Sequence, residues 1–228
     1  MFTNINMNDF EKFCLSKNPY CRSSLDSVMA SQAHGLISPY ILEERKLNVA
    51  QLDIYSRLQM DRILVLNTQV TPESANILVM QLLYLENTEP GKDINLYISS
   101  PGGSVLDGYG VIDTMNFISS PVATTVVGMA ASMGALILSC GTKGKRSGTE
   151  HSRIMIHQVL GGASGQASDI EIECKEILKL KEEINQMLTA NTGQPYEKIV
   201  KDCDRNYWMT SAEGVEYGII DRVIQKKA

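Results

Sequence analysis

An alternation of short apolar runs with helical patterns constrains the fold of this sequence more than any other feature. Apolar runs at Ile63–Leu66, Ile94–Ile98 and Val122–Val127 are each followed by a turn of small or polar residues and then by helical spacing. The run Ile63–Leu66 is uninterrupted, which is typical of a strand buried on both faces. The other two contain polar residues, Asn95 in one and Thr124 and Thr125 in the other, and are also predicted as strands. The alternation therefore predicts an α/β fold with a largely parallel sheet and crossover helices. In such a fold, ligands bind where the carboxyl ends of strands meet the amino termini of helices.

Capping signals and hydrophobic spacing place the other elements. Thr71 followed by Pro72 predicts the start of a helix that runs to about residue 87. The capping box Thr210–Glu213 predicts another helix, which ends before Gly218. Further helices are predicted at about residues 50–58, 105–118, 135–140 and 168–190 and from residue 195, and further strands at residues 153–157 and 219–224.

Charge and cysteine usage limit the classes of function. The 228 residues include 21 basic and 26 acidic side chains, and the net charge of −5 argues against a nucleic-acid-binding protein. The basic residues of the Gly- and Lys-rich segment 141–150 are interpreted as a solvated loop without chemistry: Lys143, Lys145 and Arg146. The five cysteines are scattered and form no Cys-x-x-Cys pair, which indicates reduced thiols in a cytoplasmic protein and no metal site.

Residues 1–34 differ from the rest of the chain because they are mixed, polar and without a clean period. We expect them to be an N-terminal extension or a removable propeptide, followed by one domain over residues 35–228. No basic region followed by an apolar stretch occurs at the N-terminus, and no run approaches the roughly 18 apolar residues of a membrane span. Neither export nor a membrane partner is expected.

Two strand-to-helix junctions are rich in small residues. Ser132 lies in the second of them, where a nucleophile would be accessible and close to a helix amino terminus. The segment Ala130–Gly134 matches G-x-S-x-G only in part, because alanine takes the place of the first glycine, and a structural turn is the alternative. At the first junction, the turn Pro101–Gly103 leaves backbone N–H groups free for an oxyanion or a phosphate, or is an ordinary tight turn. Neither common nucleotide-binding glycine motif is present.

The chain has three histidines, so the candidates for a general base are few. His34 lies in the N-terminal extension and His151 in a polar loop, whereas His157 directly follows the apolar run Ile154–Ile156. A general base must reach within about 3 Å of the group that it deprotonates. His157 is therefore the candidate base, and a core histidine with satisfied hydrogen bonds is the alternative interpretation.

The helix predicted over residues 168–190 has a wide apolar stripe. Its apolar residues spread over about half of the helix circumference. A helix that packs against one core needs an apolar stripe only roughly 100° wide. The apolar residues are Ile170, Cys174, Ile177, Leu178, Leu180, Ile184, Met187 and Leu188. A second contact, such as one with another subunit, would explain the excess.

Four motifs in the same order resemble the ClpP family, the proteolytic subunits of ATP-dependent Clp proteases. They are YISSPGG from residue 97, GMAASMG from residue 128, SRIMIHQ from residue 152 and GQASDI from residue 165, within a resemblance that covers about residues 35–226. It implies a ClpP/crotonase-like fold of repeated β-β-α/βαβ units with a protruding handle helix at about residues 158–190. It also implies a serine peptidase in which Ser132 is the nucleophile and His157 the base. The backbone N–H groups of Gly103 and Met133 would hold the oxyanion.

The sequence departs from the family pattern at two positions. The third triad residue of the family is an aspartate, and here Asn206 occupies that position in DCDRNYWMT. An asparagine oxygen accepts a hydrogen bond from imidazole but carries no charge to stabilise the imidazolium. The neighbouring Asp202 or Asp204 is the alternative partner of His157 and would require a different backbone register. Val159 replaces a proline that usually follows His-Gln in the family. This difference affects the expected backbone path of the following strand more than the chemistry.

The resemblance also implies how such a subunit works in an assembly. Family members form two stacked seven-membered rings that enclose the active sites, with entry controlled by N-terminal segments resembling Leu36–Ile41. AAA+ unfoldases of the ClpX or ClpA/ClpC type use ATP to deliver unfolded proteins, so the subunit itself needs no cofactor. Two alternatives are a catalytically weakened subunit of a mixed ring, suggested by Asn206, and a crotonase-type acyl-CoA enzyme that would use the same backbone donors.

Overall fold

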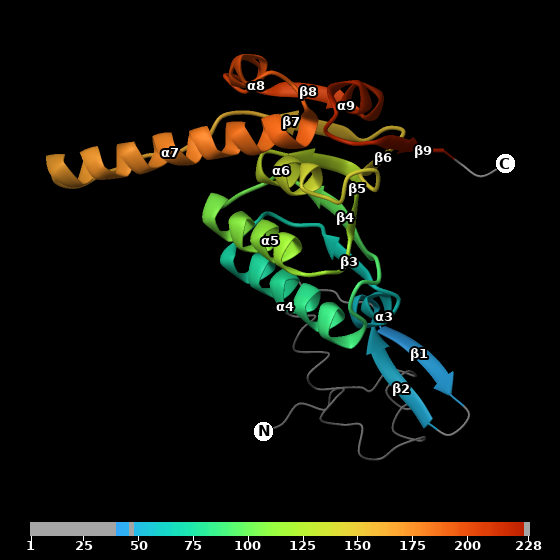
Figure 1. Ribbon diagram of the computed structural model, residues 1–228. Coiled ribbons are helices and arrows are strands. Elements are labelled where there is room, and N and C mark those ends of the chain that lie inside the picture. Colours follow the sequence, from blue (N-terminus) through green and yellow to red (C-terminus); the bar gives the residue numbers. More distant parts are fainter. Residues whose placement is uncertain (1–39, 46–47, 226–228) are drawn as a thin grey trace, which may run out of the picture. The chain divides into compact units, whose positions relative to one another are not determined.

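The computed structural model describes residues 40–45 and 48–225, and the chain divides into two compact units between Arg57 and Leu58. In the first unit, β1 (Tyr40–Arg45) and β2 (Asn48–Asp53) form an antiparallel hairpin. The helix α3 (Ile54–Met60) follows directly (Figure 1). The expected extension over residues 1–34 lies outside the described residues, as does most of the expected entry segment, residues 36–41.

The helix predicted over residues 50–58 is wrong in its first half, because residues 48–53 form the strand β2. The sequence supports both structures. Ala50 and Leu52 are two residues apart, as on one face of a strand, whereas Leu52, Tyr55 and Leu58 have helical spacing. Pairing with β1, which the local pattern does not reveal, favours the strand.

The sheet of the second unit confirms the predicted α/β class. Neighbouring parallel strands follow the order β3 (Ile63–Leu66), β4 (Ile94–Ser100), β5 (Val122–Ala131), β6 (Ser147–Thr149) and β9 (Arg222–Ile224). The end of β5 instead pairs in parallel with β7 (Arg153–Ile156), and β7 pairs antiparallel with β8 (Tyr207–Thr210). Neither β6 nor β8 is predicted by the sequence, because both are short and carry no apolar alternation. The last strand is also shorter than expected.

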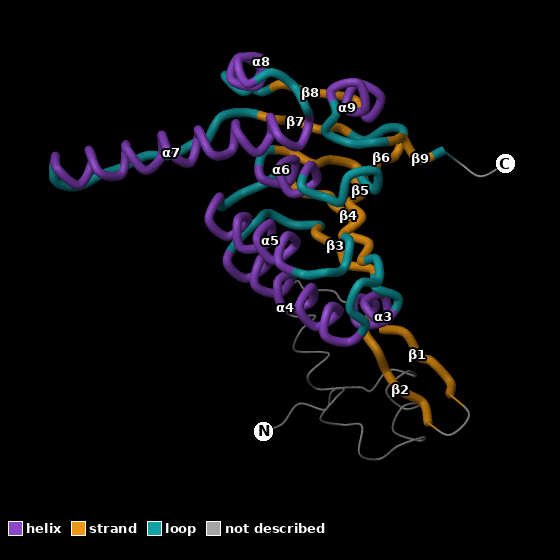
Figure 2. The backbone as a smooth tube through the Cα atoms, viewed as in Figure 1, coloured by secondary structure: helices purple, strands orange, loops and turns teal. Residues whose placement is uncertain are grey.

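Helices cover this sheet, as Figure 2 shows in purple. Their bounds lie within a few residues of those predicted: α4 (Pro72–Thr88), α5 (Val105–Phe117), α6 (Met133–Ser139), α7 (Ala167–Thr192), α8 (Tyr196–Asp202) and α9 (Ser211–Tyr217). The predicted caps are present, since the Thr71 and Thr210 side chains accept hydrogen bonds from backbone N–H groups of their helices. Every residue of α6 is buried, so this helix lies inside the core rather than on the surface.

The amino-terminal part of α7 projects from the rest of the second unit, and the segment that precedes it runs out along the helix (Figure 1). The two pack closely, because a Cβ atom on Gly161 would lie 2.7 Å from Ile177 Cδ1. The predicted apolar stripe divides along the helix. Leu188 is buried in the core near the carboxyl end, whereas Leu178 is 63% exposed in the single chain.

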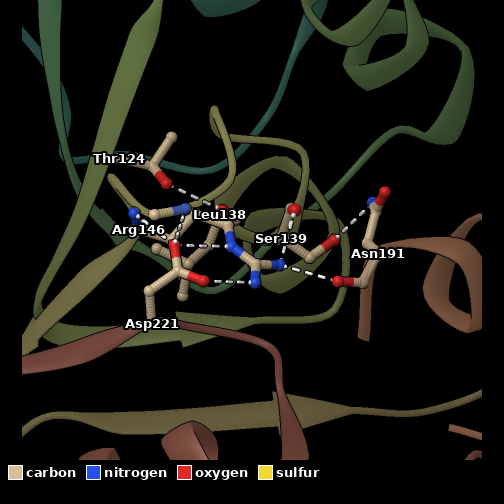
Figure 3. Close-up of polar contacts among 7 residues, drawn as sticks. Thr124, Leu138, Ser139, Arg146, Asn191 and Asp221 are labelled. Atoms are coloured by element: carbon tan, nitrogen blue, oxygen red, sulfur yellow. Dashed lines mark hydrogen bonds and ion pairs between the residues drawn. The ribbon is translucent and has the colours of Figure 1, made fainter. Parts of the chain in front are cut away.

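The structure corrects the interpretation of Arg146 as a solvated residue, because its side chain is only 4% exposed. The guanidinium donates to both carboxylate oxygens of Asp221, at 2.7 and 3.1 Å, and to the backbone carbonyls of Ser139 and Asn191 (Figure 3). Arg146 thus joins α6, the end of α7 and the segment before β9. The sequence gives no sign of this, because the buried position follows a glycine-rich loop and precedes a polar strand.

Asp221 should therefore contribute stability that depends on pH. Burial alone would raise the pKa of its carboxyl, but hydrogen bonds from Arg146 and from the backbone of Gly144 hold that pKa below its ordinary value. A carboxyl with a depressed folded-state pKa stabilises the fold above its unfolded pKa of about 3.9 and loses this contribution as the pH falls through the folded value. Asp221→Asn should lower the free energy of unfolding by about 2–4 kcal/mol at pH 7, since it breaks a largely buried pair.

Urea unfolding of both proteins at pH 7 and at about pH 3 measures this contribution. The difference between wild type and variant should shrink at the acidic pH, and an equal difference at both would contradict the assignment. Asp93→Asn is the matched control. Its carboxylate pairs with Lys145 across side chains that are 48% and 39% exposed, and such pairs contribute about 1 kcal/mol or less.

Candidate active site

The pairing of β5 with β7 brings Ser132 beside His157. The parallel register places Ala131 opposite Met155, and the next N–H along, that of Ser132, donates to the Met155 carbonyl at 2.8 Å. His157 follows two residues after Met155, just beyond the end of β7. As a result, His157 Nε2 lies 2.9 Å from Ser132 Oγ, within the distance that a general base requires.

The pairing of β7 with β8 brings Asn206 to the other side of the same imidazole. The last pair of this antiparallel ladder is Ile156 with Tyr207, so the same register continues to His157 opposite Asn206. Directly opposed residues of antiparallel strands have neighbouring side chains. The distance from His157 Nδ1 to Asn206 Oδ1 is 3.0 Å. The strand β7 thus positions all three side chains, since His157 directly follows it and it pairs with β5 and β8, the strands next to Ser132 and Asn206.

Ser132 has a backbone conformation that non-glycine residues rarely adopt, with φ 55° and ψ −123°. Such a conformation costs on the order of 1–3 kcal/mol and persists only where the surrounding structure imposes it. Here the sharp turn between β5 and α6 imposes it, with the serine at the tip. A nucleophile in this position is exposed above the end of the sheet. The geometry matches the function of G-x-S-x-G, although the sequence matches the motif only in part.

The Pro-Gly-Gly turn after β4 lies directly against Ser132. A Cβ atom on Gly102 would be 2.7 Å from Ser132 Cβ and 2.8 Å from the Met133 nitrogen, so only glycine allows this approach. Gly103 has φ +151°, and a Cβ atom there would lie 2.2 Å from the Val70 carbonyl oxygen. Among the described residues, the N–H groups of Gly103 and Met133 donate to no acceptor. They are available to a negatively charged oxygen next to Ser132.

A cavity of about 380 Å³ opens beside the Ser132 hydroxyl. Apart from Ser132, His157, Gln69 and Gln158, its lining is backbone and apolar side chains. Those that α5, α6 and α7 contribute include Val105, Leu136, Ile184 and Leu188. Sequence reasoning missed this role for α7. The signal was present as the apolar stripe, but the stripe alone does not distinguish core from cavity.

The sequence model of the Clp protease family matches residues 46–227, most of the chain. The chain belongs to the Clp protease family.

Relatives with high identity over nearly full length carry matching names. The "ATP-dependent Clp protease proteolytic subunit" of Bacteroides fragilis strain YCH46 is 55% identical over 221 residues, which cover 97% of this chain and 100% of the relative. The protein of the same name from Porphyromonas gingivalis is 51% identical over 220 residues, 96% of this chain and 99% of the relative. The "ATP-dependent Clp protease proteolytic subunit 2" of Parasynechococcus marenigrum is 57% identical over 189 residues, 83% of this chain and 96% of the relative.

In this member of the Clp protease family, the two aspartates near Asn206 do not contact His157. Asp202 Oδ2 accepts hydrogen bonds from Lys198 Nζ at 2.6 Å and from the Tyr217 hydroxyl at 2.9 Å. The Asp204 carboxylate is exposed and lies 3.8 Å from Arg205 Nε. The structure therefore does not support the alternative in which a neighbouring aspartate replaces Asn206.

A thiol does not take the place of the serine in this Clp protease site. Cys203, the cysteine nearest to Asn206 in the sequence, is buried, and burial together with the Asp202 charge raises its pKa to about 11. A thiol with that pKa is protonated at neutral pH and is a poor nucleophile. The group that His157 Nε2 contacts is the Ser132 hydroxyl.

Within residues 40–45 and 48–225, no three His, Cys, Asp or Glu side chains gather as a metal site would require. Among the helices that the structure describes, none is both long and apolar enough to cross a membrane.

Proposed function

We propose that this chain is the proteolytic subunit of an ATP-dependent Clp protease, a serine endopeptidase that hydrolyses unfolded proteins to small peptides. One observation carries the proposal. The Ser132 hydroxyl, the His157 imidazole and the Asn206 amide form a continuous hydrogen-bonded chain beside two free backbone donors. This arrangement has the components of acyl transfer by a serine, namely a nucleophile, a base, an orienting group and an oxyanion hole. The family membership and the names of the relatives agree with it.

The residues would act in two steps. His157 donates its Nδ1–H to Asn206 Oδ1, which leaves the Nε2 lone pair facing Ser132. Ser132 Oγ attacks the peptide carbonyl while Nε2 takes its proton, and the N–H groups of Gly103 and Met133 stabilise the oxyanion. The imidazolium then protonates the leaving amine, and water hydrolyses the acyl-enzyme by the same route in reverse. Each oxyanion donor is typically worth about 3–4 kcal/mol in such a site.

Asn206 limits the rate in this mechanism. It orients the imidazole as an aspartate does, but its neutral oxygen does not stabilise the imidazolium that forms when Ser132 attacks. In chymotrypsin-type proteases the equivalent exchange lowers kcat by about 10⁴-fold because the imidazole takes the unproductive tautomer, so this figure is the upper limit for Asn206. We therefore propose a serine peptidase whose activity as an isolated subunit is weak and whose full rate in the cell depends on assembly.

The cavity supports a preference for apolar side chains next to the scissile bond. Its lining from α5, α6 and α7 is aliphatic, with Leu136, Ile184 and Leu188 among the contributing residues. No Lys, Arg, Asp or Glu is among the described residues that line it. A charged side chain would lose its hydration there without a partner, whereas a leucine-sized group would bury apolar surface.

Exposed apolar surface on α7 supports assembly. Ile172 and Leu178 on α7 are each 63% exposed in the single chain. The amino-terminal part of this helix projects from the rest of the second unit (Figure 1). Residues of about 158–190 would form the handle between two stacked seven-membered rings of this chain. An AAA+ unfoldase of the ClpX or ClpA/ClpC type would use ATP to deliver substrates in the cytoplasm, and this subunit would need no cofactor of its own.

Covalent labelling of the assembled oligomer tests the proposed function. The probe is a peptidyl diphenyl phosphonate with a leucine side chain next to the phosphorus, and intact mass followed by peptide mapping locates the label. We expect one label per reactive subunit, on Ser132, and slower labelling by the probe with a lysine side chain. Ser132→Ala should take no label, whereas Ser164→Ala, which removes an exposed hydroxyl in the segment before α7, should label like the wild type.

Other results would point to the alternatives. A ring that assembles but takes no label would indicate a non-catalytic subunit. Turnover of a coenzyme A thioester that survives Ser132→Ala would indicate a crotonase-type enzyme, which needs the backbone donors but not the serine.

A further inference from the structure

The side chain of Gln158 connects three parts of the fold around the site. Gln158 follows His157, where backbone pairing of β7 has ended. Its Nε2 donates to the backbone carbonyl of Asp204 at 2.9 Å, in the turn that leads to Asn206. Its Oε1 accepts from Lys181 Nζ on α7 at 3.0 Å. The proposed mechanism gives this side chain no part.

Lys181 fixes the orientation of the Gln158 amide. An ammonium group only donates hydrogen bonds, and a backbone carbonyl only accepts them. The amide therefore satisfies both partners in one orientation, with its oxygen toward Lys181 and its NH₂ toward Asp204. The reversed amide would place donor against donor and acceptor against acceptor. Without Lys181, only the Asp204 carbonyl favours this orientation.

The Gln158 bond closes the strand pair on the far side of the imidazole. On the near side, Ile156 and Tyr207 form the last backbone pair of β7 and β8. On the far side, the bond from Gln158 to Asp204 holds the two chain segments together. His157 and Asn206 lie between these two attachments. Movement of the Asn206 backbone relative to the imidazole is restrained from both directions.

This restraint matters more for Asn206 than it would for an aspartate at the same position. Its side chain is exposed and neutral, so no ionic attraction keeps it against His157 when water competes for the hydrogen bond. An aspartate in the same place would form a charge-assisted bond to the imidazolium, which is about twice as strong. The chain thus depends on its backbone attachments for an alignment that charge would otherwise enforce.

We propose that Gln158 is a positioning residue for catalysis, which holds Asn206 against His157, and that Lys181 orients it from α7. The inference rests on the function proposed above. It predicts that the Gln158 contact matters more when residue 206 is asparagine than when it is aspartate. Gln158 also lines the cavity, so direct contact with substrate is the competing role that the experiment must separate.

Steady-state cleavage of a fluorogenic peptide with leucine before the scissile bond provides the test. Gln158→Ala should lower kcat by about 10- to 100-fold with KM within about twofold, because misplacement of the catalytic groups affects the chemical step. Gln158→Glu should lose as much, since it keeps an acceptor for Lys181 but cannot donate to the Asp204 carbonyl. Lys181→Met should lower kcat by about 3- to 10-fold, and Lys181→Arg should restore it.

Lys179→Met is the matched control, two residues away on the same helix. The described contact of Lys179 is an exposed pair with Glu176, so kcat should stay unchanged. The decisive comparison repeats Gln158→Ala in the Asn206→Asp background, where we expect its cost to fall below about threefold. Size-exclusion chromatography of each variant confirms that the assembled oligomer is compared.

Four results would overturn the inference. A higher KM with unchanged kcat would make Gln158 a substrate contact. An equal cost in the wild-type and Asn206→Asp backgrounds, or the loss of the oligomer in all the Gln158 and Lys181 variants, would make its role structural. A Gln158→Ala variant as active as the wild type would remove the role altogether. The proposed function fails separately, if neither the wild type nor Asn206→Asp cleaves the peptide.

Discussion

Asn206→Asp should raise kcat for a short peptide by about 10²- to 10⁴-fold. Proton transfer from Ser132 creates an imidazolium 3.0 Å from residue 206, and a carboxylate there stabilises this charge in the transition state, whereas the amide does not. The upper limit is the effect of the reverse exchange in chymotrypsin-type proteases, about 10⁴-fold. The lower limit corresponds to an asparagine whose oxygen already holds His157 in the productive tautomer, so that only the missing charge is restored. Single-turnover and steady-state peptide cleavage measure the change.

The control must separate a local effect from a change in overall charge. Gln186→Glu adds the same negative charge on α7, where the wild-type glutamine contacts Glu182 on the same helix. Its kcat should match that of the wild type. Equal rates for Asn206→Asp and the wild type would show that residue 206 does not limit the reaction and would remove the argument for a weakened subunit.

Much of the fold could be predicted because its signals are local. The apolar run before residue 128, the small residues around Ser132 and the cap at Thr71 each specify an element within one stretch of sequence. Local signals also made Ser132 and His157 candidates, but a structural turn and a core histidine remained alternatives, and the resemblance to a family favoured the catalytic roles. A serine at a strand-to-helix turn and a histidine at a strand end are visible without knowledge of what lies beside them.

The contacts that complete the site could not be predicted in this way, because they depend on pairing between distant segments. His157 and Asn206 are 49 residues apart and meet through the four-residue strand β8, which is too short to be recognised. The resemblance to a family supplied Asn206 as the third residue, and pairing of β7 with β8 explains its position physically. Likewise, the residues next to Arg146 in the sequence do not distinguish it from a solvated arginine. Its ion pair with Asp221, which lies far away in the sequence, makes the difference.

The cavity also could not be predicted from a local pattern. Ile184 and Leu188 belong to a stripe whose spacing indicates only that one face of α7 avoids water. In the fold, this face meets the core at one end, lines the space beside Ser132, and leaves Leu178 exposed farther along. One periodic signal thus serves a core, a binding cavity and a free apolar surface. Only the position of the helix relative to β7 and α6 distinguishes the three.

Ser132→Ala should have an effect that depends strongly on residue 206. In subtilisin, loss of the serine or the histidine lowers kcat by about 2 × 10⁶-fold, whereas loss of the aspartate alone costs about 3 × 10⁴-fold, and the losses do not add. The reason is that the three residues act as one unit, and once one is missing the others have less to contribute. If Asn206 already weakens this unit, Ser132→Ala should cost only about 10²- to 10⁴-fold in the natural chain.

In the Asn206→Asp background, Ser132→Ala should lower kcat by about 10⁶-fold, because the serine is then removed from a complete Ser-His-Asp triad. Both variants that carry Ser132→Ala should retain the same residual rate, which comes from the oxyanion donors and the cavity rather than from the triad. The four proteins form a double-mutant cycle in which peptide cleavage by each is compared under one set of conditions. Equal losses in the two backgrounds would mean that Ser132 and residue 206 act independently. In that case the contacts of 2.9 and 3.0 Å that join them through His157 would not operate as a catalytic unit.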